Sequence, residues 1–177
     1  GARDVAFHAI PGAVMQKLWH QVHFPPFNWF SGKADIFHFT NFTDRPLSRG
    51  KSVVTIHDMS FERYPQFAEK RNLRYLCSGL RHTVRNTDAI IAVSEFSKSE
   101  VEALLPDSSG KVTVVYPGIS AGFSRATDAE IEAVRKKIGL TRPYILTLGT
   151  LEPRKNLGFL MNLFEKVAPQ GIDLVVS

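Results

Sequence analysis

Residues 145–167 read ILTLGTLEPRKNLGFLMNLFEKV and change character halfway along. Ile145 to Leu148 form a short apolar run, which predicts a buried strand. Asn156 can cap a helix that follows it. The apolar positions of this helix keep helical spacing: Leu157, Leu160, Met161, Phe164 and Val167. The stretch therefore predicts a strand, a loop and an amphipathic helix in succession.

Arg154 and Lys155 lie in the loop of this stretch, at the junction between strand and helix. Free backbone N–H groups at a helix start, the positive end of the helix dipole and two cationic side chains would converge there. This combination suits a phosphate or a pyrophosphate. A solvated basic turn is the alternative, because single strand–loop–helix patterns occur by chance in many folds.

Short apolar runs alternate with helical patterns along the rest of the chain, which is typical of an α/β fold with a parallel sheet covered by helices. The candidate strands are 35–39, 53–56, 89–93, 112–115, 145–148 and 173–176. One candidate helix carries Leu73, Leu76, Cys77, Leu80 and Val84 on a single face. Two others are predicted to begin at Ser97, with Glu100 three positions on, and at Thr127, with Glu130 three positions on and an end at Gly139.

Composition narrows the class of protein further. The chain has 177 residues, 44% of them hydrophobic, which is enough for a real core. Its net charge of +5 favours anionic partners without choosing among them. Cys77 is the single cysteine, so an internal disulfide and a site of several thiolates are excluded. With no run of about 20 apolar residues and no signal-peptide pattern, we expect a soluble, cytoplasmic protein.

Residues 116–124, YPGISAGFS, are rich in residues that stop regular structure, and they predict a domain boundary. We expect one domain over residues 1–123 and the start of another over residues 124–177. The second part offers only helix, strand, helix and strand, which is too little for a complete doubly wound domain. The sequence therefore looks like a fragment.

Five motifs in this order resemble glycosyltransferase family 4: DIFHFTNF (35–42), VVTIHDMSFERYPQF (53–67), AIIAVSEFSKSEV (89–101), KVTVVYPGI (111–119) and YILTLGTLEPRKNLGFLMNLF (144–164). Several ordered motifs are far more specific than one. The resemblance implies the GT-B fold, in which two Rossmann-like domains face a cleft. It also implies an acceptor site on the N-terminal domain, a nucleotide-sugar site on the C-terminal domain, and transfer with retention of configuration and without a metal.

The resemblance assigns roles to particular residues. Lys155, with Arg154 beside it, matches the basic pair that holds the donor diphosphate, while Thr150 stands where many members have an arginine. His57 matches a histidine that faces the donor sugar, and Asp58 is a candidate to orient its ring. Without the other motifs, a single His-Asp pair is more often structural.

Further candidates follow the ends of predicted strands, where ligands bind in open α/β sheets. His38 and Asn41 are possible substrate contacts, although His38 is equally explained as a core histidine. Ser94 and Ser97 resemble the serine-containing turn of the family, and Ser97 also has a structural explanation as a helix cap. Gly118 matches the turn before the interdomain crossover, where we expect a backbone conformation that favours glycine.

Residues 15–33 mix aromatic rings with cations. The cations and histidine are Lys17, His20 and Lys33, and the rings are Trp19, Phe24, Phe27, Trp29 and Phe30. This mixture suits peripheral contact with the inner face of a membrane or a lipid-linked acceptor. An aromatic core segment with a turn at Pro25-Pro26 is the alternative, and the local pattern slightly favours it.

Two features that the resemblance leads one to expect are missing. Gly12-Ala13 is a poor substitute for the first strand and glycine-rich loop of the N-terminal domain, and no Glu-x7-Glu motif follows Lys155. We therefore expect this chain alone to have little or no transferase activity.

The predicted activity is transfer of a hexosyl group from a nucleotide diphosphate sugar to a saccharide or lipid-linked saccharide. GDP-mannose is the preferred donor, because TLEPRKN resembles mannosyltransferases of bacterial polysaccharide assembly. No cofactor, metal or nucleic acid is expected, and no nucleic-acid-binding motif is present. Three alternatives stay open: a sugar-nucleotide epimerase or phosphorylase, a nucleic-acid binder that uses the positive charge, and a hydrolase with His38, His57 and Asp58 as metal ligands.

Overall fold

The computed structural model describes residues 12–68, 70–168 and 170–177. They form two compact units, of which the first ends at Pro117 and the second begins at Gly118. We refer to them as the N-terminal unit and the C-terminal unit, and each is described by itself.

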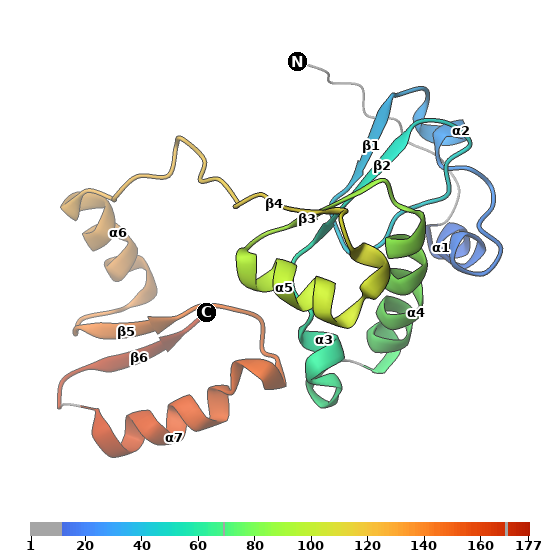
Figure 1. Cartoon of the computed structure of the whole chain (residues 1–177). Helices are drawn as coiled ribbons and strands as arrows, with labels where there is room; N and C mark the ends of the chain where they lie inside the picture. Colours follow the sequence, from blue (N-terminus) through green and yellow to red (C-terminus); the bar gives the residue numbers. More distant parts are fainter. Residues whose placement is uncertain (1–11, 69, 169) are drawn as a thin grey trace. The chain divides into compact units, whose positions relative to one another are not determined.

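Four parallel strands form the sheet of the N-terminal unit: β1 (Ile36–Phe39), β2 (Lys51–Ile56), β3 (Ala89–Ala92) and β4 (Val112–Val114). Their order across the sheet is β1-β2-β3-β4 (Figure 1). The register pairs Phe39 with Val54 and Ile56 with Ala92. The predicted α/β class with a Rossmann-like parallel sheet is therefore confirmed, and each strand lies within two residues of its predicted bounds.

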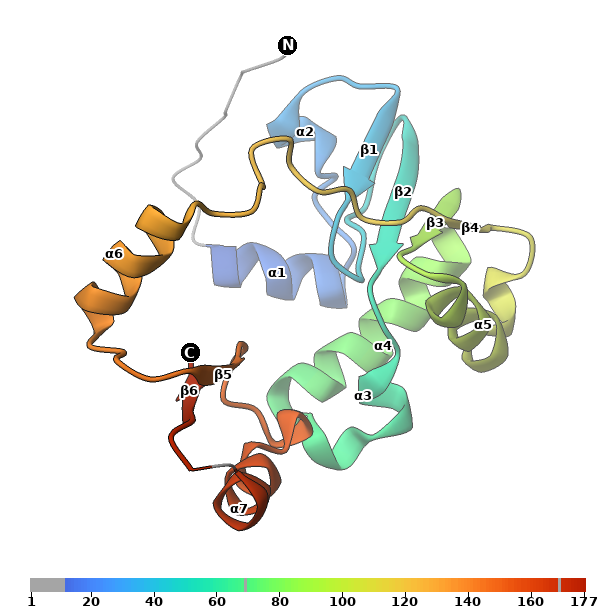
Figure 2. The ribbon, with the colours of Figure 1, turned by 90° about the vertical axis from the view of Figure 1, so that its left-hand side faces the viewer.

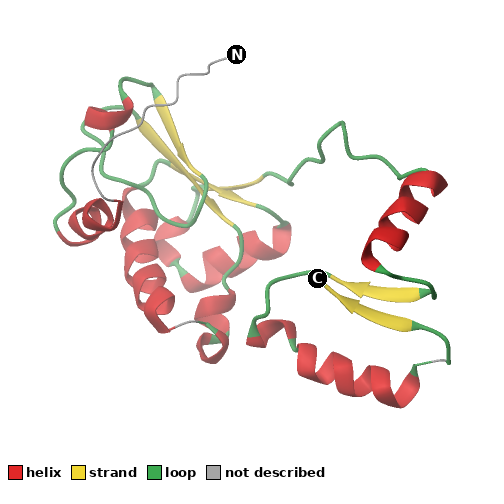
Figure 3. Cartoon of the chain, turned by 180° about the vertical axis from the view of Figure 1, so that it is seen from behind, coloured by secondary structure: helices red, strands yellow, loops and turns green. Residues whose placement is uncertain are grey.

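The helices either precede β1 or lie in the connections between β2, β3 and β4. They are α1 (Gly12–Gln21), α2 (Asn28–Ser31), α3 (Ser60–Arg63), α4 (Lys70–Asn86) and α5 (Glu95–Leu104), with short 3-10 turns at Pro65–Phe67 and Pro106–Ser108 (Figures 1 and 3). Gly12 begins α1, so it does not form part of a glycine-rich loop after a strand.

The core lies between one face of the sheet and helices α4 and α5. Its buried residues include Val54 and Ile56 of β2, Ile90 and Ala92 of β3, Leu80 and Val84 of α4, and Val101 and Leu105 of α5. Side chains at alternate strand positions point to the same face, which explains why every second residue of β2 and β3 belongs to this set. Cys77 packs against the same cluster, and burial raises the pKa of its thiol.

The start of α5 differs from the sequence prediction. Ser94 caps this helix, because its hydroxyl oxygen accepts a hydrogen bond from the backbone N–H of Ser97 at 3.1 Å. Ser97 is therefore the third residue of the helix, and Glu100 forms an ion pair with Arg63 instead of closing a capping box. Both serines are residues that favour helix caps, and the observed hydrogen bond assigns the cap to Ser94.

The C-terminal unit contains strands β5 (Tyr144–Thr147) and β6 (Asp173–Val176), which pair in parallel. Helix α6 (Asp128–Ile138) precedes them, and the capping box of Thr127 with Glu130 and the end at Gly139 are confirmed. Between β5 and β6 lie a 3-10 turn, η3 (Pro153–Lys155), and helix α7 (Leu157–Val167).

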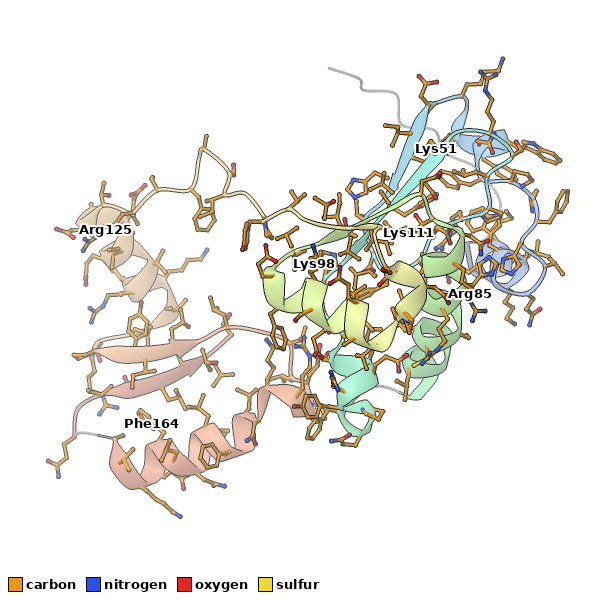
Figure 4. All side chains as sticks on the ribbon, in the orientation of Figure 1. Lys51, Arg85, Lys98, Lys111, Arg125 and Phe164 are labelled. Carbon is orange, nitrogen blue, oxygen red and sulfur yellow. The ribbon has the colours of Figure 1, made fainter. Side chains whose placement is uncertain are left out.

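Helix α7 lies along one face of β5 and β6 (Figures 1 and 3). Its half-buried residues, Leu157, Leu160 and Phe164, form one row at helical spacing, and Phe164 is labelled in Figure 4. Asn156 precedes the helix as predicted, but its side chain makes no cap hydrogen bond, because its backbone is left-handed with a φ of 50°. The prediction of a side-chain cap at Asn156 is therefore wrong.

Gly50 fixes the turn between β1 and β2. Its φ is +95°, and a Cβ atom added there would lie 2.8 Å from Cε2 of Phe37 and 2.9 Å from the carbonyl oxygen of Ala34. Both the left-handed conformation and the close approach of Ala34 exclude a side chain at this position.

We expect Gly50→Ala to lower the free energy of unfolding by about 1–3 kcal/mol more than Gly32→Ala, the excess arising from overpacking. Gly32 is the matched control, because it is also left-handed, with a φ of +85°, but has no atom within 4 Å of an added Cβ. Chemical denaturation of both variants measures the difference. Equal decreases in the free energy of unfolding would show that the close approach of Ala34 does not destabilise the Gly50 variant.

Candidate functional site

The predicted residues of the N-terminal unit gather at the carboxyl ends of its strands. Because β1, β2 and β3 are parallel, these ends lie at one edge of the sheet, and Figure 2 shows the arrows of β1 and β2 ending on the same side. Asn41, His57 and Ser94 follow β1, β2 and β3 respectively. The fold thus brings together side chains from three separate motifs.

His57 is exposed, and its ring has a defined partner. Nε2 lies 2.9 Å from the carbonyl oxygen of Thr40. A carbonyl can only accept, so Nε2 donates the hydrogen, and Nδ1 of the neutral ring keeps a lone pair. The ring of Phe42 stands edge-on to it, with 5.7 Å between centroids. His57 can therefore offer a hydrogen-bond acceptor to a ligand from a fixed ring.

Asp58 does not orient this ring, which corrects the sequence prediction. Its Oδ1 accepts hydrogen bonds from the backbone N–H of Ser60 at 2.8 Å and from the Ser60 hydroxyl at 2.6 Å. Aspartate commonly bonds to the backbone two residues on, and here this local turn starts helix α3. The role of ring partner belongs to Thr40.

Ser97 connects helix α5 to His57. Its hydroxyl donates to the carbonyl oxygen of His57 at 2.9 Å, while the hydroxyl of Ser94 lies 3.1 Å from that of Ser97. Ser97 is only 5% exposed. The start of α5 therefore holds the backbone at the carboxyl end of β2, a contact that a helix-cap pattern cannot reveal.

His38 and Asn41 are the remaining candidates of this unit, and Gly118 is the first residue of the C-terminal unit. His38 is exposed, so it is not a core histidine, and its Nε2 lies 2.8 Å from Oγ1 of Thr55. The exposed Asn41 accepts a hydrogen bond from the N–H of Thr43 through its backbone carbonyl. Gly118 has no positive φ and no atom within 4 Å of an added Cβ, so the expected conformational need for glycine there is wrong.

We expect Ser97→Ala to lower the free energy of unfolding by about 1–2 kcal/mol, because the carbonyl of His57 loses its donor in a buried position. Ser99→Ala is the control. Ser99 lies on the exposed side of the same helix, where its hydroxyl donates to the carbonyl of Phe96 at 2.8 Å, and its loss should stay within about 0.5 kcal/mol. A denaturation experiment in which the two variants behave alike would contradict this role of Ser97.

The cationic loop of the C-terminal unit comprises residues 149–156. After β5, the N–H of Gly149 donates to the carbonyl of Ser177 at 2.9 Å, and Gly149 has a φ of +146°. The side chain of Lys155 folds over this glycine, and an added Cβ would lie 3.6 Å from its Cε and 3.9 Å from its Nζ. Among the described residues, this ammonium has no hydrogen-bond or salt-bridge partner. Lys155 is therefore a cation available to an anionic ligand.

Arg154 and Thr150, in contrast, share an acidic partner that the sequence analysis missed. The hydroxyl of Thr150 donates to Oε1 of Glu152 at 2.6 Å, and Nε of Arg154 forms an ion pair with Oε2. The Thr150 hydrogen bond and then the Arg154 guanidinium lower the pKa of the Glu152 carboxyl below its ordinary value. The spacing of Thr150, Glu152 and Arg154 at every second position could have indicated that these side chains lie on one side of the loop. Only the loop conformation shows that they contact one another.

Several cations of the N-terminal unit form ion pairs or hydrogen bonds with other groups of the same unit. Of the labelled residues in Figure 4, Lys51 pairs with Asp88, Arg85 with Asp107 and Lys98 with Glu102. Lys111 donates to the carbonyl oxygens of Val84 and Arg85. These cations therefore already have partners within the protein, whereas Lys155 has none among the described residues.

A cavity of about 450 Å³ lies in the N-terminal unit, but it is not at the predicted site. Its walls include Ser52 at the start of β2, Asp88 before β3, and Asp44. Asp44 accepts a hydrogen bond from the Thr83 hydroxyl at 2.7 Å, and Asp88 accepts one from the N–H of Ser52 at 2.8 Å. The carboxylates of this cavity stabilise the fold, and none of the predicted site residues lines it.

The described residues contain no cluster of three His, Cys, Asp or Glu side chains that could hold a metal ion. His38, His57 and Asp58 thus do not form the metal site of the hydrolase alternative. In the described part of the chain, no helix is both long and apolar enough to cross a membrane.

The aromatic stretch divides between core and surface. Phe27 packs edge-on against Phe37 and Phe39 of β1, and the indole N–H of Trp19 donates to the carbonyl of Pro25 at 2.7 Å. Phe24 and Trp29, by contrast, are 53% and 62% exposed. The core interpretation accounts for Phe27, whereas the exposed rings of Phe24 and Trp29 pack edge-on against each other, with 5.4 Å between their centroids.

Comparisons with known proteins agree with the motifs. Residues 5–123 match the family model of Glycosyltransferase Family 4. The chain is 30% identical over 134 residues to O-antigen chain mannosyltransferase B of Escherichia coli. The match covers 75% of this chain and 35% of that protein, so the chain spans about a third of its relative's length.

Proposed function

Since the chain belongs to glycosyltransferase family 4, we propose that its protein transfers a hexosyl group from a nucleotide diphosphate sugar to a saccharide or lipid-linked saccharide acceptor, with retention of configuration. The observation that carries this proposal is the ammonium of Lys155 over Gly149, which has no hydrogen-bond or salt-bridge partner among the described residues, with Arg154 in the same loop. Together they form the diphosphate site of the donor.

The chemistry of the leaving group supports this role of the loop. A nucleoside diphosphate gains negative charge as the glycosidic bond breaks. Cations fixed beside it stabilise that charge more in the transition state than in the ground state, which lowers the barrier. Thr150 contributes to the same loop through its hydrogen bond to Glu152.

We assign sugar contacts to the edge of the N-terminal sheet. His57 hydrogen-bonds a sugar hydroxyl through Nδ1, because its other nitrogen is held by Thr40. His38, Asn41 and Ser94 are further substrate contacts at or near the same edge. No metal takes part in this proposal.

Mannose is the proposed sugar and GDP the proposed nucleotide. The similarity to O-antigen chain mannosyltransferase B supports this choice, as does the sequence TLEPRKN of the cationic loop.

We also propose peripheral contact with the inner face of a membrane. The exposed rings of Phe24 and Trp29 lie in the same stretch as Lys17 and Lys33. Aromatic rings settle at the headgroup level and lysines meet anionic lipid, which would bring a lipid-linked acceptor to the protein.

We expect GDP-mannose to raise the unfolding temperature of the full-length protein more than UDP-glucose or ADP-glucose does. A ligand at 100 times its Kd that binds only the folded protein adds about 2.7 kcal/mol of stability. Thermal-shift measurements over the three donors test this. A response to UDP-glucose alone would remove the mannose assignment, and no response to any donor would count against a nucleotide-sugar site.

We expect Lys155→Met to weaken binding of inorganic pyrophosphate about 10- to 100-fold, because one charged hydrogen bond of about 1.5–3 kcal/mol is lost. Lys166→Met is the matched control. Lys166 is an exposed lysine in the last turn of α7, and its substitution changes the net charge by the same amount. Isothermal titration calorimetry gives both affinities, and an equal loss in the two variants would mean that only net charge matters.

A further inference from the structure

Glu152 occupies the centre of the cationic loop and is held from several sides. Its backbone N–H donates to the carbonyl of Thr150 at 2.8 Å, and its own carbonyl accepts from the N–H of Lys155 at 2.9 Å. Its two carboxylate oxygens have different donors, the hydroxyl of Thr150 and Nε of Arg154. Pro153 follows it and restricts the backbone of the turn. The carboxylate is therefore fixed before any ligand arrives.

The ion pair with Glu152 uses only one nitrogen of Arg154. Its contact is made through Nε, and the two terminal nitrogens have no hydrogen-bond partner among the described residues. A guanidinium has five N–H donors in a planar fork, and the edge formed by Nη1 and Nη2 suits two oxygens of a phosphate. Arg154 is thus anchored at one side and available at another.

We propose that Glu152 is a positioning residue for anion binding: it holds the guanidinium of Arg154 through Nε so that Nη1 and Nη2 meet the diphosphate, and Thr150 in turn holds Glu152. This inference rests on the proposed function of the loop as a diphosphate site. It assigns to an acidic residue a favourable part in binding an anion.

The opposite view makes Glu152 a competitor that neutralises Arg154 until a phosphate displaces it. Removal of the negative charge would then strengthen the binding of any anion. The arrangement favours positioning, because a competitor would occupy the terminal nitrogens, whereas the observed contact leaves them unused. Arginine side chains carry much rotamer freedom, and an anchored guanidinium loses less of it when a ligand binds.

Two substitutions separate these views. Glu152→Ala removes both the charge and the anchor. Glu152→Gln removes the charge but keeps an oxygen that can accept from Arg154 and an amide N–H that can donate to the oxygen of Thr150. Glu165→Ala is the control, since Glu165 is an exposed residue of α7 whose loss changes the net charge equally.

Isothermal titration calorimetry with inorganic pyrophosphate, in buffer without divalent metal, gives the affinities of the four proteins. We expect Glu152→Ala to bind about 3–10-fold more weakly than wild type, which corresponds to immobilising one flexible side chain. Glu152→Gln should stay within about twofold of wild type or bind more tightly, and Glu165→Ala should bind no more weakly than wild type. An affinity of Glu152→Ala equal to or above that of wild type would overturn the proposal.

NMR spectroscopy can monitor the hydrogen bond between Nε of Arg154 and Glu152 directly. In ¹⁵N-correlated NMR spectra, the Nε–H signal of Arg154 should be protected from exchange in wild type and in Glu152→Gln, and lost in Glu152→Ala. Backbone amide spectra show whether each variant is folded. A protected signal that persists in Glu152→Ala would refute the anchor regardless of any binding result.

The proposed function and this inference fail in different ways. If the wild-type protein does not bind pyrophosphate, or binds it no more tightly than Lys155→Met does, the result counts against the diphosphate site itself. Binding that depends on Lys155 but is undiminished in Glu152→Ala counts against the positioning role alone.

Discussion

Parallel pairing of β2 with both β1 and β3 is the interaction on which the N-terminal unit depends. It aligns the carboxyl ends of three strands at one edge, so that residues from motifs far apart in the sequence become neighbours. The buried face of β2 and β3 against α4 and α5 fixes this register, because a shift by one residue would turn Val54 and Ile56 away from the core. The position of His57 follows from that constraint.

In the C-terminal unit, the parallel pairing of β5 and β6 likewise positions the residues that follow a strand. The ladder of β5 and β6 extends to the hydrogen bond between Gly149 and Ser177, and the chain leaves it at a glycine with a positive φ. A side chain at this point would lie in contact with Lys155. The loop conformation thus sets where the ammonium lies, and Glu152 sets how the neighbouring guanidinium is held.

Periodicity predicted where the elements lie, but the predicted burial of the strand at Ile145 to Leu148 is wrong, since Ile145 and Leu146 are 49% and 47% exposed. The strand bounds, the apolar face of α4 and the capping box at Thr127 each arise from a pattern within a few residues, and the structure agrees with them. The assignments at Asp58, Ser97 and Asn156 were not predictable, because a short polar side chain can bond to several neighbouring backbone groups. Packing of the surrounding elements chooses among those partners.

By itself, the sequence determined the α/β class, the order of the elements and the concentration of positive charge after β5, since hydrophobic spacing and turn residues act locally. Only the tertiary structure decided that Thr40 holds the ring of His57, that Ser97 ties α5 to β2, and that Glu152 contacts both Thr150 and Arg154. Hydrogen bonds extend about 3 Å and require alignment, so they depend on the final positions of atoms that no spacing along the chain specifies.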